Sequence, residues 1–356
     1  MTATSFGFNS LVQPASSVSQ TVPSGFDVNK AYLLASATSA VVQLYAQGIT
    51  QLTPAMLAAL PLVDTAASYQ QLAVFTAPEA IGLGASAATS TQSSSTPGVY
   101  LSVTIGVALQ ALDANSNPLF TVIALRGTQT YQEWVNDLTA LPQSFALVSG
   151  SGWVHSGFYA LYTTGTDGQA PTSSNLRVAG SLADQITTAV SATSWPAKVP
   201  LYVTGHSLGA ALAELCAMDL ANNASGTSSS MTMIAFAPPQ VSAGLIDNGT
   251  TFYNPTAFQT AFQSSVPDSY AVVNAADLVP LMPPTLGSAT GIQLDFNPVV
   301  STANTVMYCA QLGTIGANHE LTLNYLPYAQ ALAGGLSAQV VRRRAAEPAP
   351  QHAPSA

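Results

Sequence analysis

Residues 205–209 read Gly-His-Ser-Leu-Gly, a spacing typical of a nucleophilic serine. An apolar run beginning at Leu201 precedes this motif, and a helical pattern of apolar residues follows it as far as Leu220. Strand, sharp turn and helix in this order would lift the Ser207 hydroxyl above the end of a sheet. The Leu208 N–H and the positive end of the helix would then face any anion that forms there. The alternative is a turn of small residues that only packs a helix against a sheet.

A serine hydroxyl needs a base, which is usually a histidine oriented by a carboxylate. In proteins with this turn the order along the chain is serine, acid, histidine. Of the four histidines, His206 is adjacent to the serine, His155 precedes it and His352 lies near the end of the chain. The order therefore selects His319 as the base. The alternative for His319 is an ordinary place in a helix-capping region.

The acid should lie between the serine and His319, just past the end of a strand. The acidic residues in that interval are Glu214, Asp219, Asp247, Asp268, Asp277 and Asp295. Asp277 directly follows an apolar strand pattern that ends at Asn274, so we expect it to be the acid. Asp247 is the second candidate and Asp295 the third. The alternative for each of these aspartates is a solvated turn.

An oxyanion hole requires a second hydrogen-bond donor besides the Leu208 N–H. The loop Arg126-Gly127-Thr128 follows an apolar run typical of a buried strand, which is the usual place for such a donor. We expect Thr128 to supply its backbone N–H and its hydroxyl. Arg126 is expected to be buried and to brace the loop through an ion pair.

Alternating strand and helix patterns predict an α/β protein whose central sheet is mostly parallel. Helices are expected over 27–47, 53–62, 131–139, 157–164, 176–194 and 319–333. Strands are expected over 69–77, 142–149, 198–204, 231–237 and 269–274, with hairpins over 99–125 and 293–308. A single domain should cover residues 26–340, between an irregular arm (1–25) and a flexible tail (341–356). Residues 83–97 are rich in Ser and Thr and are expected to form a loop.

Composition limits the functional classes. Apolar residues make up 48% of the 356 residues, charged residues only 6%, and the net charge is −9. The few cations form no basic face for nucleic acid, whereas a weakly charged surface suits a lipid or another neutral substrate. Neither metal-ligand spacing nor a membrane-spanning run is visible, so neither a metal nor a cofactor is expected. Cys216 and Cys309 could form one disulfide or remain two buried thiols. The compartment stays open; secretion is favoured, although the N-terminus lacks a signal-peptide pattern.

Five ordered blocks resemble the class 3 lipase family, the fungal-type triacylglycerol lipases, within the α/β-hydrolase superfamily. The blocks start at Ile123, Trp134, Val154, Gly205 and Asn274, and a looser sixth contains His319 with Tyr325-Leu326. The resemblance implies an α/β-hydrolase fold, a triad of Ser207, Asp277 and His319, and an oxyanion hole at Thr128 and Leu208. It further implies that residues 130–138 form a short lid helix whose apolar face carries Tyr131, Trp134, Val135 and Leu138.

Together these patterns predict a serine ester hydrolase, a lipase, that acts on acylglycerols or similar apolar esters through an acyl-enzyme on Ser207. The same family includes phospholipases and feruloyl esterases, so either of these activities is an alternative. A non-catalytic binding protein on this fold is a third interpretation, which the complete set of catalytic residue types disfavours.

Overall fold

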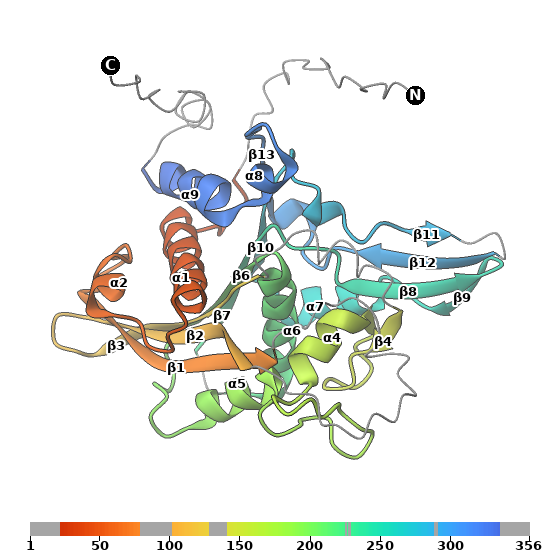
Figure 1. Ribbon diagram of the computed structural model, residues 1–356, viewed down its shortest axis with the longest axis horizontal. Coiled ribbons are helices and arrows are strands. Elements are labelled where there is room, and N and C mark those ends of the chain that lie inside the picture. Colours follow the sequence, from red (N-terminus) through yellow and green to blue (C-terminus); the bar gives the residue numbers. More distant parts are fainter. Residues whose placement is uncertain are drawn as a thin grey trace, which may run out of the picture.

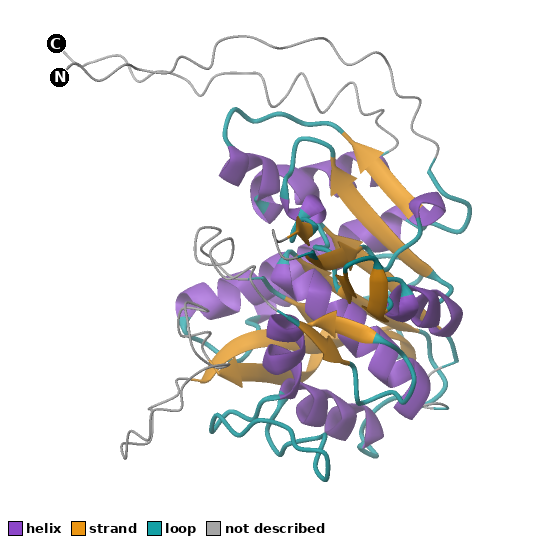
Figure 2. Ribbon diagram, turned by 90° about the vertical axis from the view of Figure 1, so that its right-hand side faces the viewer, coloured by secondary structure: helices purple, strands orange, loops and turns teal. Residues whose placement is uncertain are grey.

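A seven-stranded sheet lies at the centre of the protein, with helices on both faces (Figure 1, Figure 2). The computed structural model describes residues 22–78, 102–127, 141–224, 226, 229–287 and 291–334. From edge to edge the strands are β1 (Ser68–Pro78), β2 (Ser102–Leu112), β3 (Pro118–Leu125), β6 (Leu201–His206), β7 (Met231–Phe236), β10 (Ser269–Asn274) and β13 (Thr305–Tyr308). The first three are antiparallel, and β3 to β13 are parallel. The predicted α/β class and the mostly parallel sheet are therefore confirmed.

Helices cover the two faces of the sheet and create two hydrophobic cores. One core lies under α1 (Val28–Gln47), the π-helical turn η3 (Leu321–Tyr325) and α9 (Leu326–Ala333). The other lies under α4 (Ser156–Thr163), α5 (Leu182–Ser191), α6 (Leu208–Asn223) and α7 (Ala257–Ser265). The remaining short helices are α2 (Pro54–Ala58), η1 (Val279–Leu281), η2 (Thr302–Asn304) and α8 (Ile315–His319). No helix in the described ranges is both long enough and apolar enough to cross a membrane.

Helix α1 begins and ends where the sequence predicts. The Asp27 side chain accepts the N–H groups of Asn29 and Lys30 at 2.9 and 3.0 Å, and Gly48 ends the helix with a φ of 64°. Such a cap satisfies N–H groups that have no partner inside the helix. Lys30 is buried over the Phe120 ring and pairs with Asp64. This apolar helix is thus fixed against the sheet at its first turn.

Helix α5 is shorter than predicted, because it starts at Leu182 and not at Leu176. Gly180 has a φ of 74°, which a helix cannot contain, and the Ser181 side chain caps the Asp184 N–H. Before this helix, the Arg177 side chain forms an ion pair with the buried Asp219 of α6. The apolar residues of 176–181 therefore belong to a loop that packs against the core and not to the helix.

A second, antiparallel sheet was not predicted. It contains β11 (Leu286–Gly287), β12 (Ile292–Asn297), β8 (Ser242–Asp247), β5 (Trp153–His155) and β4 (Pro142–Ser144), with β9 (Thr250–Tyr253) paired to β8. In Figure 1 one side of the molecule carries the projecting strands β8, β9, β11 and β12 of this sheet. The predicted hairpin over 293–308 is therefore wrong, since β12 pairs with β8 whereas β13 extends the central sheet. The strand predicted over 142–149 stops at Ser144, and turns follow it.

Glu214 places a carboxyl group inside the second core. It is 1% exposed, and its Oε2 has no hydrogen-bond partner among the described residues. Burial raises the pKa of this carboxyl well above its ordinary value. The folded protein therefore holds a proton there that the unfolded chain releases once the pH exceeds the ordinary carboxyl pKa.

Because the folded protein keeps this proton, we expect its free energy of unfolding to fall as the pH rises. Above the ordinary pKa the folded state binds more protons than the unfolded state, so the free energy of unfolding falls, by at most about 1.4 kcal/mol per pH unit. Glu214→Gln should remove this slope, and urea unfolding from pH 4 to pH 8 measures it. Glu320→Gln, at an exposed glutamate, is the control. Parallel pH dependences for the wild type and Glu214→Gln would contradict the expectation.

Candidate active site

Ser207 lies at the sharp turn between β6 and α6. Its φ of 59° and ψ of −128° are unusual for a residue with a side chain, and its exposure is 6%. A Cβ atom on Gly205 would overlap the Gly209 carbonyl, so the strand and the helix can approach this closely only with glycine. Gly205 and Gly209 thus allow the close packing of strand and helix that places Ser207 at the tip of the turn.

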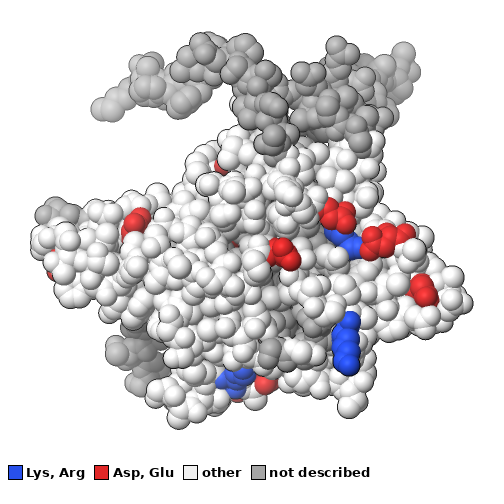
Figure 3. Space-filling model, turned by 180° about the vertical axis from the view of Figure 1, so that it is seen from behind, with Lys and Arg blue, Asp and Glu red and all other residues white. Residues whose placement is uncertain are grey.

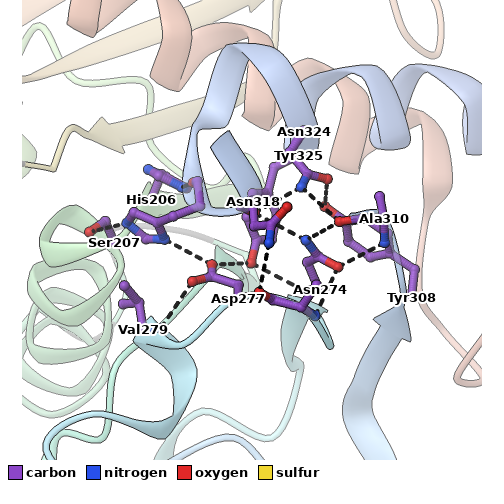
Figure 4. A network of polar contacts seen from close by, with 12 residues as sticks. His206, Ser207, Asn274, Asp277, Val279, Tyr308, Ala310, Asn318, Asn324 and Tyr325 are labelled. Atoms are coloured by element: carbon purple, nitrogen blue, oxygen red, sulfur yellow. Dashed lines mark hydrogen bonds and ion pairs between the residues drawn. The ribbon is translucent and has the colours of Figure 1, made fainter. Parts of the chain in front are cut away.

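His319 contacts both Ser207 and Asp277, and these two partners are labelled in Figure 4. Its Nε2 lies 2.8 Å from the Ser207 Oγ, and its Nδ1 lies 2.8 Å from the Asp277 Oδ2. A carboxylate only accepts hydrogen bonds, so the Nδ1 carries the proton and the Nε2 is free to accept the serine hydroxyl. The structure therefore brings together the three side chains that the sequence order selects. His319 is the last residue of the short helix α8 and not the first residue of the helix expected over 319–333.

Asp277 is buried and receives two further hydrogen bonds. The Val279 N–H donates to Oδ1 at 2.9 Å, and the Tyr325 hydroxyl donates to Oδ2 at 2.6 Å. Burial raises the pKa of Tyr325 well above its ordinary value, so the hydroxyl keeps its proton. Donors of this kind stabilise an ionised carboxylate. Tyr325 reaches Asp277 from the π-helical turn, a backbone conformation that the sequence pattern does not reveal.

His206 contacts the backbone of His319, and its ring lies beside the His319 ring at a tilt of 32°. The His206 Nε2 lies 2.7 Å from the His319 carbonyl oxygen, and the two ring centroids are 4.7 Å apart. Burial lowers the pKa of His206 well below its ordinary value. The ring is therefore neutral at physiological pH and donates its Nε2–H to that carbonyl.

The other candidates have different surroundings. His155 stacks on Phe158 and accepts the Gly157 N–H at 3.2 Å, and burial lowers its pKa to about 3. Both alternative acids belong to the second sheet: Asp247 accepts a hydrogen bond from Asn248, and Asp295 accepts one from Thr285. His352 lies outside the described residues.

Gly127 passes directly over the serine. A Cβ atom on this residue would lie 2.8 Å from the His206 carbonyl oxygen and 2.9 Å from the Ser207 Cβ. The buried Arg126 holds the same loop by donating to the carbonyls of Thr104 and Gly127, each at 2.7 Å, and by stacking on Tyr45. The predicted oxyanion donor Thr128 lies outside the described residues, as do the predicted lid residues Tyr131, Trp134, Val135 and Leu138.

Two further expectations concern cysteines and metals. Cys216 is buried and Cys309 is exposed, and both are free, so the disulfide alternative is wrong and only one thiol is buried. In the described part of the chain, no group of three or more His, Cys, Asp or Glu side chains is placed to hold a metal ion.

Comparisons with known proteins point to one family. Residues 122–287 match the family described as Lipase (class 3). Phospholipase A1-II 7 of Oryza sativa subsp. indica is 33% identical over 245 residues, which cover 62% of this chain and 54% of the rice protein. The lipase of Rhizomucor miehei is 32% identical over 165 residues, which cover 46% of this chain and 37% of the fungal protein. The chain spans about half the length, or less, of these curated relatives.

Solved structures of fungal lipases are also similar to this chain. A deletion mutant of the Rhizomucor miehei lipase in its propeptide complex has a TM-score of 0.48 and 19% identity, over 84% of this chain and 80% of that one. The lipase of Rhizopus microsporus var. chinensis has a TM-score of 0.48 and 18% identity, over 78% and 80% of the two chains.

Proposed function

We propose that this chain, which matches the class 3 lipase family over residues 122–287, is a serine hydrolase of apolar carboxylic esters such as acylglycerols. The observation that carries the proposal is the continuous hydrogen-bonded array from the Ser207 hydroxyl through His319 to Asp277. A serine hydroxyl that donates to a neutral imidazole, itself held by a carboxylate, is poised for nucleophilic attack.

In the proposed reaction the Ser207 Oγ attacks the ester carbonyl while the His319 Nε2 takes the hydroxyl proton. The tetrahedral intermediate collapses as His319 returns that proton to the leaving alcohol, which leaves the acyl group on the serine. Water then attacks the acyl-enzyme while His319 takes its proton, and the second intermediate collapses as His319 returns that proton to the Ser207 Oγ and the carboxylic acid departs. Asp277 keeps the histidine in the required tautomer and stabilises its positive charge.

The developing oxyanion needs donors near the serine. The Leu208 N–H lies at the beginning of α6, where the helix dipole also favours negative charge. We propose Thr128 as the second donor. The close approach of Gly127, which precedes Thr128 in the sequence, to Ser207 supports this assignment.

Apolar side chains near the triad in the sequence support an apolar substrate. Leu278 and Leu281 follow Asp277 and are 43% and 62% exposed, and Ile315, four residues before His319, is 49% exposed. Charged groups are sparse over the face of the molecule in Figure 3. We propose that residues 130–138 add an apolar lid helix, with Tyr131 and Trp134 on its inner face. Such a helix would cover the serine in water and open at a lipid surface, where its apolar side chains gain contacts.

A phospholipase is the second candidate, because the rice relatives are named phospholipases A1. Ester bonds of phospholipids and of triacylglycerols demand the same chemistry at the serine. The two candidates differ only in the head group that the site accepts.

Hydrolysis of a substrate series tests the proposal. We expect turnover of p-nitrophenyl esters from acetate to palmitate and of a triacylglycerol emulsion, with a rise in rate where the substrate passes its solubility limit. A higher rate on phosphatidylcholine vesicles than on the emulsion would favour the phospholipase, and preference for methyl ferulate a feruloyl esterase. A rate that saturates smoothly through the solubility limit would contradict the moving lid. A folded protein inactive on every ester would contradict the hydrolase.

A further inference from the structure

Asp277 and His319 lie on two turns that are far apart in the sequence. Asp277 lies three residues beyond Asn274, the last residue of β10, whereas His319 ends α8. Their hydrogen bond of 2.8 Å therefore depends on how the acid turn (Asn274–Asp277) and the base turn (α8) are held together.

The Asn274 side chain ties the acid turn to the base turn. It is fully buried, and its Nδ2 donates to the carbonyls of Asn318 at 3.1 Å and of Ala310 at 2.8 Å. Its Oδ1 accepts the N–H groups of Ala310 at 2.9 Å and of Ala276 at 3.2 Å. The amide thus uses both donors and both lone pairs, and its orientation is fixed because oxygen faces N–H groups while nitrogen faces carbonyls.

Asn318 makes the reciprocal contact from the base turn. Its Nδ2 donates to the Ala276 carbonyl at 3.1 Å, and its Oδ1 accepts the Leu312 N–H at 2.7 Å. Asn318 immediately precedes His319, and Ala276 immediately precedes Asp277. The residue before each member of the pair is therefore bonded to an asparagine side chain of the opposite turn (Figure 4).

Asn324 fixes the base turn to the rest of the fold without contacting the acid turn in the contacts described. Its Nδ2 donates to the Asn318 carbonyl at 2.8 Å, and its Oδ1 accepts the Tyr308 hydroxyl at 2.8 Å. These bonds connect the base turn to the end of β13. Besides the Asp277–His319 bond itself, Asn274 and Asn318 each provide one side-chain hydrogen bond between the acid turn and the base turn, and removal of either amide would remove that bond.

We propose that Asn274 and Asn318 are positioning residues that set the geometry between Asp277 and His319 through these two reciprocal hydrogen bonds. The inference rests on the proposed hydrolase function, since proton transfer to His319 is what demands the geometry. Neither asparagine touches Ser207 in the contacts described, so both act through the acid and the base. A displacement of about 1 Å at a catalytic group can cost about 10²-fold in rate.

The test measures kcat and KM for Asn318→Ala and Asn318→Asp, each in the wild-type and the Asp277→Ala background. We expect kcat to fall by about 10²-fold with KM nearly unchanged in the wild-type background. In the Asp277→Ala background the same substitutions should change kcat by less than about 2-fold, because the geometry they protect no longer exists. Tyr162→Phe, which removes a buried hydrogen bond to Asp219, controls for a general loss of stability and should leave kcat unchanged.

A second measurement does not depend on turnover. The His319 Nδ1 proton, bonded to a carboxylate, should give a downfield proton resonance that weakens or shifts in Asn318→Ala and persists in Tyr162→Phe. A wild type with this resonance but without activity would refute the proposed hydrolase and leave the positioning role standing. Equal losses of kcat in both backgrounds, an unchanged resonance in folded Asn318→Ala, or failure of both Asn318 variants to fold would overturn the positioning role.

Discussion

Ser207→Ala is expected to fold as the wild type does and to lose about 10⁶-fold in ester turnover. The serine supplies the atom that forms the acyl bond, and no neighbouring group can replace it in the array with His319. The alanine variant should also lose covalent labelling by a fluorophosphonate, followed by mass spectrometry of the labelled peptide. Labelling at another serine in the wild type would show that the nucleophile has been misassigned.

Ser207→Gly is the matched control for the backbone at this position. Alanine tolerates a φ of 59° no better than serine does, whereas glycine adopts it freely. Strain of this kind costs about 1–3 kcal/mol, so Ser207→Gly should unfold at a higher temperature than Ser207→Ala. Both variants should be equally inactive, which separates the chemistry of the hydroxyl from the conformation that presents it.

Asp277→Asn is expected to reduce turnover by about 10⁴-fold. The carboxylate receives three donors, from His319, Tyr325 and the Val279 N–H. An asparagine has only one oxygen to offer, so at least one donor would face the amide nitrogen. His319 could then adopt the tautomer with a proton on Nε2, which cannot accept the serine proton. Steady-state kinetics on a soluble short-chain ester measures the loss.

The two aspartates on the second sheet provide controls for this result. Asp247→Asn and Asp295→Asn remove the same charge at carboxylates bonded to Asn248 and Thr285. Both should keep turnover within about 2-fold of the wild type, as surface substitutions usually do. A severe loss in either one, with a mild effect of Asp277→Asn, would move the acid to the other aspartate.

Local sequence patterns predicted the elements that are stabilised locally. Helix α1 has its cap and its terminating glycine in the sequence, and the strands β6, β7 and β10 are continuous apolar runs buried on both faces. Strand β8 was not recognised and β12 was assigned a wrong partner, because these two strands are stabilised by pairing with each other across about fifty residues of sequence. Periodicity carries no information about a partner at that distance.

The candidate site shows the same division. The motif around Ser207, the strand end before Asp277 and the chain order that selects His319 identified three residues that the structure brings into contact, although their catalytic roles remain predictions. Tyr325 was noticed only as part of a loose motif, because a π-helical turn alters which residue faces Asp277. The hydrogen bonds of Asn274 and Asn318 could not be predicted from the sequence, because each forms between two turns that are far apart in the chain.

The first and last described helices also determine the order in which the molecule can be completed. Helix α1 packs against α9, and the two cover one core together (Figure 1). They are separated by roughly 300 residues, which a ribosome adds in roughly 15–60 s. During synthesis the part of α1 that packs on α9 therefore stays uncovered until α9 has been made, whereas its contacts with β2, β3 and β6 can form earlier. A nascent chain of this protein should depend on chaperones over that interval, and a chain cut short before α9 should aggregate.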